Sequence, residues 1–347
     1  MLKAINVIQW LVANPGPTQD FLATPGNVDT VITWARNPAW GPTWGAWEQS
    51  DEAVQWALSH GKRCMVCVTS SDLPPGWGYA ERRQLVFDTI DRYPECSVIV
   101  SNEPSFAPAV ARARSLSVAA VIDDKAIAMR PAHDGTKEAL AAYLRGGPLL
   151  ASAAGPRIRA SESAQLMKDA AEHAAGLKSG TGSTHLLGPA EATFWGTPNC
   201  LKYLWGYAPP KGVRVDVAMH HYYDLVNGGA RMTRTALAAM KLLRLHGSWR
   251  PNLFLTEGGY IFHVGRSPAY NPADPSNPAG YEYLSRAADE AMQLQRIMRF
   301  YPWCKKQSQI ALWANYEVVD SLSSGWASGP FAHDGTLKLI LPHWAGL

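Results

Sequence analysis

Two glutamates in this sequence follow short apolar segments that are typical of buried strands. Glu103 lies near the end of Ser97-Val-Ile-Val-Ser-Asn-Glu-Pro104, and Glu257 follows Leu253-Phe-Leu-Thr256 and precedes two glycines. The β-branched residues predict a strand, and the proline after Glu103 ends it. Because strands are rigid, both carboxyl groups would be held in fixed directions. A pair of opposed carboxyl groups is what glycosidic-bond hydrolysis requires, one as proton donor and the other as nucleophile or base.

Further polar or aromatic residues stand at the ends of the apolar segments, beside the two glutamates. They are Arg36, Asn102, His220, Tyr222 and Trp313. Any one of them could be a capping or packing residue, but their concentration after strands favours a functional site. The chain has 14 Trp and 13 Tyr but only 8 Phe, so rings with a polar edge predominate. Trp40 and Trp77 lie in loops, where they fit either sugar platforms or packing under the loops.

Strands and helices alternate along the chain, which predicts parallel strands joined by crossover helices. We expect strands over residues 5–12, 30–35, 63–69, 98–100, 184–187, 213–219, 253–257 and 309–313, and helices over residues 51–60, 79–93, 162–177, 233–246 and 283–300. Eight such units predict an α/β fold, a single (β/α)8 TIM barrel over residues 1–347, with its chemistry at the C-terminal strand ends. The segment at about residues 107–159 is too long for a barrel connection, so we interpret it as an insertion after strand 4.

Charge and composition exclude several kinds of partner. The formal net charge is only +3 and no run of Lys and Arg occurs, so we expect no nucleic acid partner. No apolar run approaches membrane-spanning length and the N-terminus lacks the pattern of a secretory signal, so we expect no membrane partner and a cytoplasmic or phage-associated setting. The five cysteines show no disulfide framework, which favours a reducing compartment. Cys64 and Cys67 would point to opposite faces of one strand, which disfavours a metal or redox site.

The order of these motifs resembles that of the clan A superfamily of (β/α)8 glycoside hydrolases, which includes cellulases, mannanases, xylosidases and β-galactosidases. The segments that carry the resemblance are Ser97–Pro104 with its Asn-Glu-Pro motif, Leu187-Gly-Pro-Ala190, Asp216-Val-Ala-Met-His-His-Tyr222, Leu255-Thr-Glu-Gly-Gly259, and the closing segment from Ser328 to Lys338. Each motif is short, but their ordered series spans nearly the whole chain outside the predicted insertion.

The resemblance implies a retaining glycoside hydrolase that needs no cofactor and cleaves a β-type bond in an oligosaccharide or polysaccharide, such as a cell-wall glycan. Glu103 would be the acid/base and Glu257 the nucleophile, with their carboxyl groups about 5 to 5.5 Å apart. The other implied roles are a hydrogen bond from Asn102 to the hydroxyl next to the anomeric carbon, Arg36 beneath the nucleophile, Tyr222 donating to Glu257, His220 lining the subsite and Trp313 flooring the sugar pocket.

Three departures from the family pattern leave the substrate and the subfamily open, one of which is the predicted insertion, which has no counterpart in the family. The third strand ends in Thr69-Ser-Ser71 without the histidine that many members have, and Val100 and Ser101 stand where an aromatic residue is usual. Two other functions also remain open. One is a metal-dependent hydrolase on the same fold, for which His220, His221, Asp224 and Glu257 are possible ligand types. The other is a barrel that binds carbohydrate without cleaving it.

Overall fold

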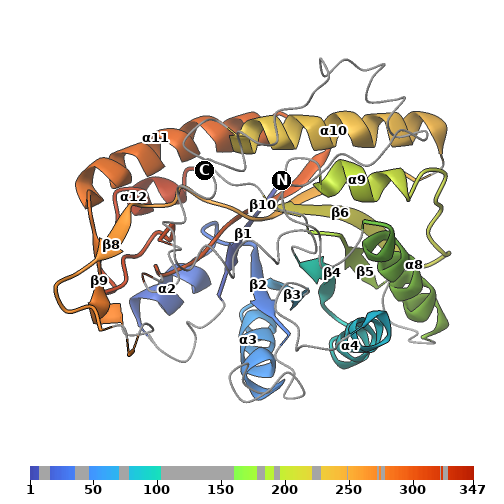
Figure 1. Ribbon diagram of the computed structural model, residues 1–347, viewed down its shortest axis with the longest axis horizontal. Coiled ribbons are helices and arrows are strands. Elements are labelled where there is room, and N and C mark those ends of the chain that lie inside the picture. Colours follow the sequence, from blue (N-terminus) through green and yellow to red (C-terminus); the bar gives the residue numbers. More distant parts are fainter. Residues whose placement is uncertain are drawn as a thin grey trace.

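The computed structural model describes residues 1–7, 16–35, 47–69, 78–102, 160–177, 184–190, 196–220, 228–247, 249–271, 273–274, 278–320, 322 and 327–347. Eight parallel strands form a closed barrel (Figure 1). They are β1 (Leu2–Asn6), β2 (Thr30–Trp34), β3 (Arg63–Thr69), β4 (Ser97–Asn102), β5 (His185–Leu187), β6 (Arg214–His220), β7 (Leu253–Glu257) and β10 (Ile310–Asn315). They follow one another around the barrel in chain order, and β10 closes it against β1. The predicted (β/α)8 fold is confirmed.

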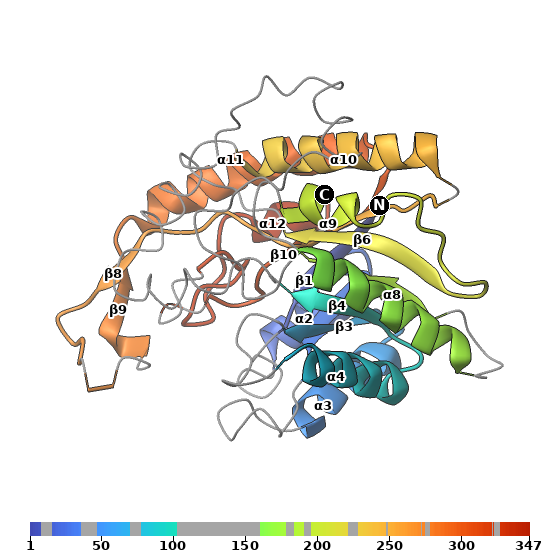
Figure 2. The same ribbon diagram turned by 45° about the vertical axis from the view of Figure 1, so that its right-hand side comes forward.

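Helices surround these strands in both views of the molecule (Figures 1 and 2). They are α2 (Pro17–Ala23), α3 (Trp47–Ser59), α4 (Tyr79–Arg92), α8 (Ala160–Gly176), α9 (Gly196–Lys202), α10 (Gly228–His246), α11 (Arg286–Lys305) and α12 (Leu341–Trp344), with a short 3-10 turn, η3, at Pro278–Gly280. In α8 the buried positions Met167, Ala170, Ala171 and Ala174 recur at helical spacing, so one face packs on the barrel.

The strands separate two apolar layers. On β4, Val98 and Val100 belong to the layer between strands and helices, whereas Ile99 belongs to the layer inside the barrel. Cys64 and Cys67 fall in different layers, as the strand alternation predicted. All five cysteines are buried, and none of them forms a disulfide.

Apart from shifts of a few residues at helix ends, the structure differs from the sequence prediction mainly in three places. β1 spans Leu2–Asn6, so it begins earlier than the strand predicted over residues 5–12, of which residues 8–12 lie outside the described residues. The seven-residue helices α2 and α9 were not predicted, because so short a segment carries little helical periodicity. Residues 281–283 form a strand, β9 (Tyr281–Tyr283), which pairs antiparallel with β8 (Val264–Arg266), so α11 begins only at Arg286. The hairpin projects away from the barrel (Figure 1). The predicted insertion at 107–159 lies outside the described residues.

Candidate active site

The C-terminal ends of β4, β6 and β7 bring together three of the predicted site residues. Asn102, His220 and Glu257 are 2%, 1% and 6% exposed. His220 pairs in register with Glu257 on the neighbouring strand, and its Nε2 lies 3.5 Å from Glu257 Oε2. The same Nε2 lies 2.5 Å from Asn102 Oδ1. The imidazole therefore lies between the carboxylate and the amide.

These contacts define how His220 and Asn102 are oriented. The amide oxygen of Asn102 can only accept, so His220 Nε2 carries the hydrogen and donates it. On the other side of the ring, Thr256 Oγ1 lies 3.5 Å from Nδ1, which in this tautomer is an acceptor. With its oxygen accepting from His220, Asn102 has only its amino group, Nδ2, with which to donate.

His220 is a neutral imidazole in this site. Complete burial lowers the pKa of His220 from 6.5 to about 3, because the protonated ring would be removed from water. The ring is therefore a hydrogen-bond donor without a positive charge at neutral pH.

We expect this buried imidazole to make the protein less stable in acid. In the unfolded chain His220 takes up a proton near pH 6.5, whereas in the folded protein it stays neutral down to about pH 3, so the unfolded state binds more protons between these values. Its contribution to the free energy of unfolding is complete above pH 6.5 and falls by about 1.4 kcal/mol per pH unit below it.

Urea denaturation at a series of pH values would measure this slope. His220→Gln should lose that part of the pH dependence, and His60→Gln, at an exposed position on the outer surface, should keep it. Equal slopes for the parent protein and His220→Gln would contradict the expectation.

The loops after β7 and β10 meet beside Glu257. The backbone N–H of Tyr316 donates to the carbonyl of Gly258 at 2.7 Å, and Asn315 Nδ2 donates to the carbonyl of Ser328 at 2.9 Å. A Cβ on Gly259 would lie only 2.9 Å from the Cβ of Ser328 and 3.0 Å from Asn315 Oδ1. Glycine is therefore required at 259 for the two loops to approach this closely.

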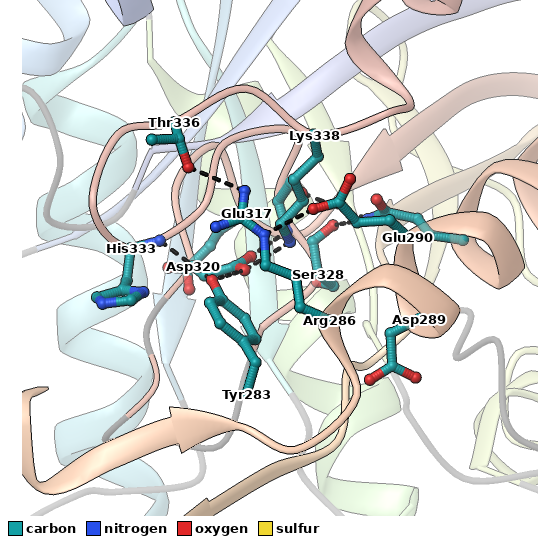
Figure 3. A network of polar contacts seen from close by, with 12 residues as sticks. Tyr283, Arg286, Asp289, Glu290, Glu317, Asp320, Ser328, His333, Thr336 and Lys338 are labelled. Atoms are coloured by element: carbon teal, nitrogen blue, oxygen red, sulfur yellow. Dashed lines mark hydrogen bonds and ion pairs between the residues drawn. The ribbon is translucent and has the colours of Figure 1, made fainter. Parts of the chain in front are cut away.

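A buried polar network lies next to these loops (Figure 3). The Lys338 ammonium lies 2.5 Å from Asp320 Oδ2, and both side chains are 0% exposed. Tyr283 on β9 donates to the same oxygen at 2.5 Å, and the N–H of Gly329 donates to Oδ1 at 2.7 Å. Lys338 Nζ also lies 3.7 Å from the ring centre of Phe262. The network joins the β8–β9 hairpin to the segment that follows β10.

Trp313 does not lie in the site, and its predicted role as the floor of a sugar pocket is wrong. The side chain is 0% exposed and packs against Tyr301 of α11 and Trp344 of α12, at ring distances of 5.2 and 5.7 Å. It belongs to the layer between strands and helices, whereas its neighbours Leu312 and Ala314 face the barrel interior. The partly exposed aromatic residue at the end of β10 is Tyr316, three positions later.

The other predicted site residues, Glu103, Arg36, Tyr222, Trp40 and Trp77, lie outside the described residues. So do His221 and Asp224 of the metal-site alternative. In the ranges that the structure covers, no three His, Cys, Asp or Glu residues gather as ligands for a metal ion. Within the same ranges, no helix has both the length and the apolar character needed to cross a bilayer.

Asn6, Thr256 and Tyr316 also lie at this rim and were not predicted. Asn6 ends β1, and its Nδ2 donates to the carbonyl of Thr256, the residue before Glu257, at 3.0 Å. The signal for it was present, because Asn6 follows an apolar pair, but the first strand was predicted to continue to residue 12.

The barrel has the fold of known glycoside hydrolases, although no protein-family model and no curated protein matches the sequence. A thermostable mutant of a xylanase from Cellvibrio japonicus is similar over 100% of this chain and 96% of its own, with a TM-score of 0.55 and 12% identity. A broad-specificity endoglucanase from an uncultured bovine rumen ciliate is similar over 96% of this chain and 87% of its own, with a TM-score of 0.54 and 10% identity.

A calcium-binding mutant of Bacteroides uniformis β-glucuronidase 2 is similar over 99% of this chain, with a TM-score of 0.52 and 11% identity. This chain spans only 34% of that protein. The structural neighbours thus come from clan A, as the sequence resemblance implied, and at these identities they establish the (β/α)8 fold.

Proposed function

We propose that this protein is a glycoside hydrolase that cleaves a β-type glycosidic bond in an oligosaccharide or polysaccharide by retaining double displacement. The observation that carries the proposal is the buried carboxylate of Glu257 at the C-terminal rim, 3.5 Å from a neutral imidazole that also holds Asn102. In a (β/α)8 barrel this rim is where catalytic residues lie. The glycoside hydrolases that share the fold support the assignment.

Glu257 is the nucleophile in this proposal. Its carboxylate attacks the anomeric carbon while Glu103, as the acid, protonates the leaving oxygen, which gives a covalent glycosyl-enzyme. Glu103 then acts as a base toward the water that releases the sugar with its original configuration. A neutral His220 suits this role, because an imidazolium 3.5 Å away would pair with the carboxylate and weaken it as a nucleophile. Arg36 and Tyr222 would keep Glu257 ionised.

Asn102 would bind the sugar hydroxyl next to the anomeric carbon. His220 occupies the amide oxygen of Asn102, so the amino group is left to donate, and that bond strengthens as charge develops on the sugar. His220 is then a positioning residue for Asn102 as well as a neighbour of the nucleophile. Tyr316 replaces Trp313 as the proposed aromatic surface at the end of β10, and Trp40 and Trp77 remain proposed platforms in the loops.

We expect Glu103→Ala to lose activity in a way that depends on the leaving group. The variant lacks the proton donor, so it should hydrolyse a natural glycoside about 10²- to 10⁴-fold more slowly than the parent protein does. On an aryl glycoside with an acidic phenol as leaving group, the first step needs little proton donation and should stay close to the parent rate. Single-turnover kinetics on the two substrates would measure the difference. Glu95→Ala, at an exposed position before the same strand, is the matched control. Equal losses on both substrates would exclude Glu103 as the acid.

A screen of aryl glycosides and wall polysaccharides, with the stereochemistry of the product followed by NMR, tests the function as a whole. Retention of the anomeric configuration is the expected result. Inversion would show that Glu257 is not a nucleophile. Tight binding of a carbohydrate without turnover of any substrate would indicate a carbohydrate-binding barrel in place of a hydrolase.

A further inference from the structure

A second polar cluster lies at the opposite rim of the barrel. Ser97 is the first residue of β4, His185 is the first residue of β5, and Asp216 is the third residue of β6. Since a strand rises about 3.3 Å per residue, Ser97 lies about 16 Å along β4 from Asn102. The cluster is therefore separate from the candidate glycosidase site, and nothing in that site's chemistry uses it.

The three side chains form a directed chain of hydrogen bonds. His185 Nδ1 lies 2.9 Å from Ser97 Oγ, and His185 Nε2 lies 3.0 Å from Asp216 Oδ2. Burial alone would raise the pKa of Asp216, but hydrogen bonds from His185 and the N–H of Asn252, together with the charge of Arg214, lower it below its usual value. An ionised Asp216 can only accept, so in the neutral ring Nε2 carries the hydrogen and Nδ1 accepts from the serine hydroxyl.

This arrangement has the polarity of a nucleophile, a general base and an orienting acid. The orienting carboxylate is buried, since the Asp216 side chain is 3% exposed, whereas the His185 side chain is 18% exposed and can be reached by solvent. Arg214 Nε donates to Asp216 Oδ2 at 2.7 Å, and the Arg214 side chain is 51% exposed, so a cation lies at the solvent edge of the cluster. The ring of Phe254 packs edge-on to His185 at 5.2 Å and helps to fix the imidazole.

We propose that Ser97, His185 and Asp216 form a second, hydrolytic site that cleaves small carboxylic esters. A role limited to stability would be served by the contacts of Asp216 with His185, Arg214 and Asn252, which together satisfy the buried carboxylate. Satisfying the Asp216 carboxylate does not require the Ser97 hydroxyl at His185 Nδ1. The position of Ser97 on Nδ1 adds a nucleophile to a base that is already oriented.

The reaction is a two-step acyl transfer. Ser97 Oγ bonds to the ester carbonyl carbon as its proton passes to His185 Nδ1, and the carbonyl π electrons move onto the oxygen of the tetrahedral intermediate. The carbon–oxygen bond to the alcohol then breaks, and the alcohol leaves with the proton from His185. Water attacks the acyl-serine with the same proton transfers, which releases the carboxylic acid and restores Ser97.

A fluorophosphonate probe on the full chain, followed by peptide mapping, tests the site without any variant. The expected result is a phosphonylated Ser97, and p-nitrophenyl acetate should be hydrolysed with the same sensitivity to the probe. Ser97→Ala should lose both reactions and keep glycosidase activity, while His185→Gln should slow labelling by about 100-fold or more.

Ser59→Ala is the matched control for this test. Ser59 Oγ lies 3.2 Å from His60 Nδ1 on the surface, but this histidine has no carboxylate partner among the described residues. The variant should be labelled at the parent rate. Absence of labelling, a label on another residue, or equal labelling of Ser97→Ala would each overturn the proposal, and none of these outcomes bears on the glycosidase assignment.

Discussion

Glu257→Gln should abolish glycoside hydrolysis, with a fall in kcat on the order of 10⁴-fold or more. The amide has the shape of the carboxylate but lacks the charge that, in the proposed mechanism, attacks the anomeric carbon. The fold should tolerate the change, because the nearby His220 is neutral with a pKa of about 3, so removing the carboxylate charge leaves no unpaired charge on this ring. Substrate affinity should therefore change little.

Two measurements separate loss of chemistry from loss of binding. Steady-state rates give kcat, and titration calorimetry with the uncleaved substrate gives Kd. A 2-fluoro glycoside with a good leaving group should accumulate as a covalent adduct on the peptide that contains Glu257. Glu282→Gln, at an exposed position on β9, is the control and should keep full activity. Hydrolysis by Glu257→Gln at the parent rate would remove Glu257 from the mechanism.

Lys338→Met should lower the free energy of unfolding by about 3 to 5 kcal/mol, because it leaves the fully buried carboxyl group of Asp320 without its cation. Burial raises the pKa of Asp320 and lowers the pKa of Lys338, so each group depends on the other to remain charged. The methionine side chain has a similar length and should still pack against Phe262.

A double-mutant cycle with Asp320→Asn measures this dependence. Each single change should be costly, and the double variant should cost clearly less than their sum, because it removes both charges. Urea denaturation gives the free energies. The control is Arg83→Met, which removes a pair with Asp169 that is 3.7 Å apart and has its arginine side chain 48% exposed, and it should cost less than about 1 kcal/mol. Strictly additive costs for Lys338 and Asp320 would contradict the pairing.

The barrel and the strand-end positions could be predicted because the alternation of apolar runs with helical segments is a local signal. Which face each strand residue presents could not be predicted in the same way. Both faces of a parallel barrel strand are buried, so the run from Ile310 to Ala314 is apolar throughout and does not show that Trp313 points toward the helices. The polar residues after such runs are more informative, since Asn102, His220 and Glu257 do meet.

Contacts between segments that are distant along the chain could not be predicted from the sequence either. His220 and Asn102 are 118 residues apart, and only closure of the barrel brings them together. Lys338 reverses the usual pattern, because the lysine is buried while its neighbours Leu337 and Leu339 are 59% and 50% exposed. Lysine is almost never fully buried without a partner, so the burial of Lys338 depends on its ion pair with Asp320 and could not be predicted from the residue type.

The uncharged ring of His220 has a consequence for the choice of inhibitors. Since that ring adds no positive charge near Glu257 above about pH 3, the carboxylate would attract a ligand that brings its own cation. Sugar mimics with a basic nitrogen in place of the ring oxygen or the anomeric carbon meet this requirement, and they would gain affinity as long as their amine stays protonated.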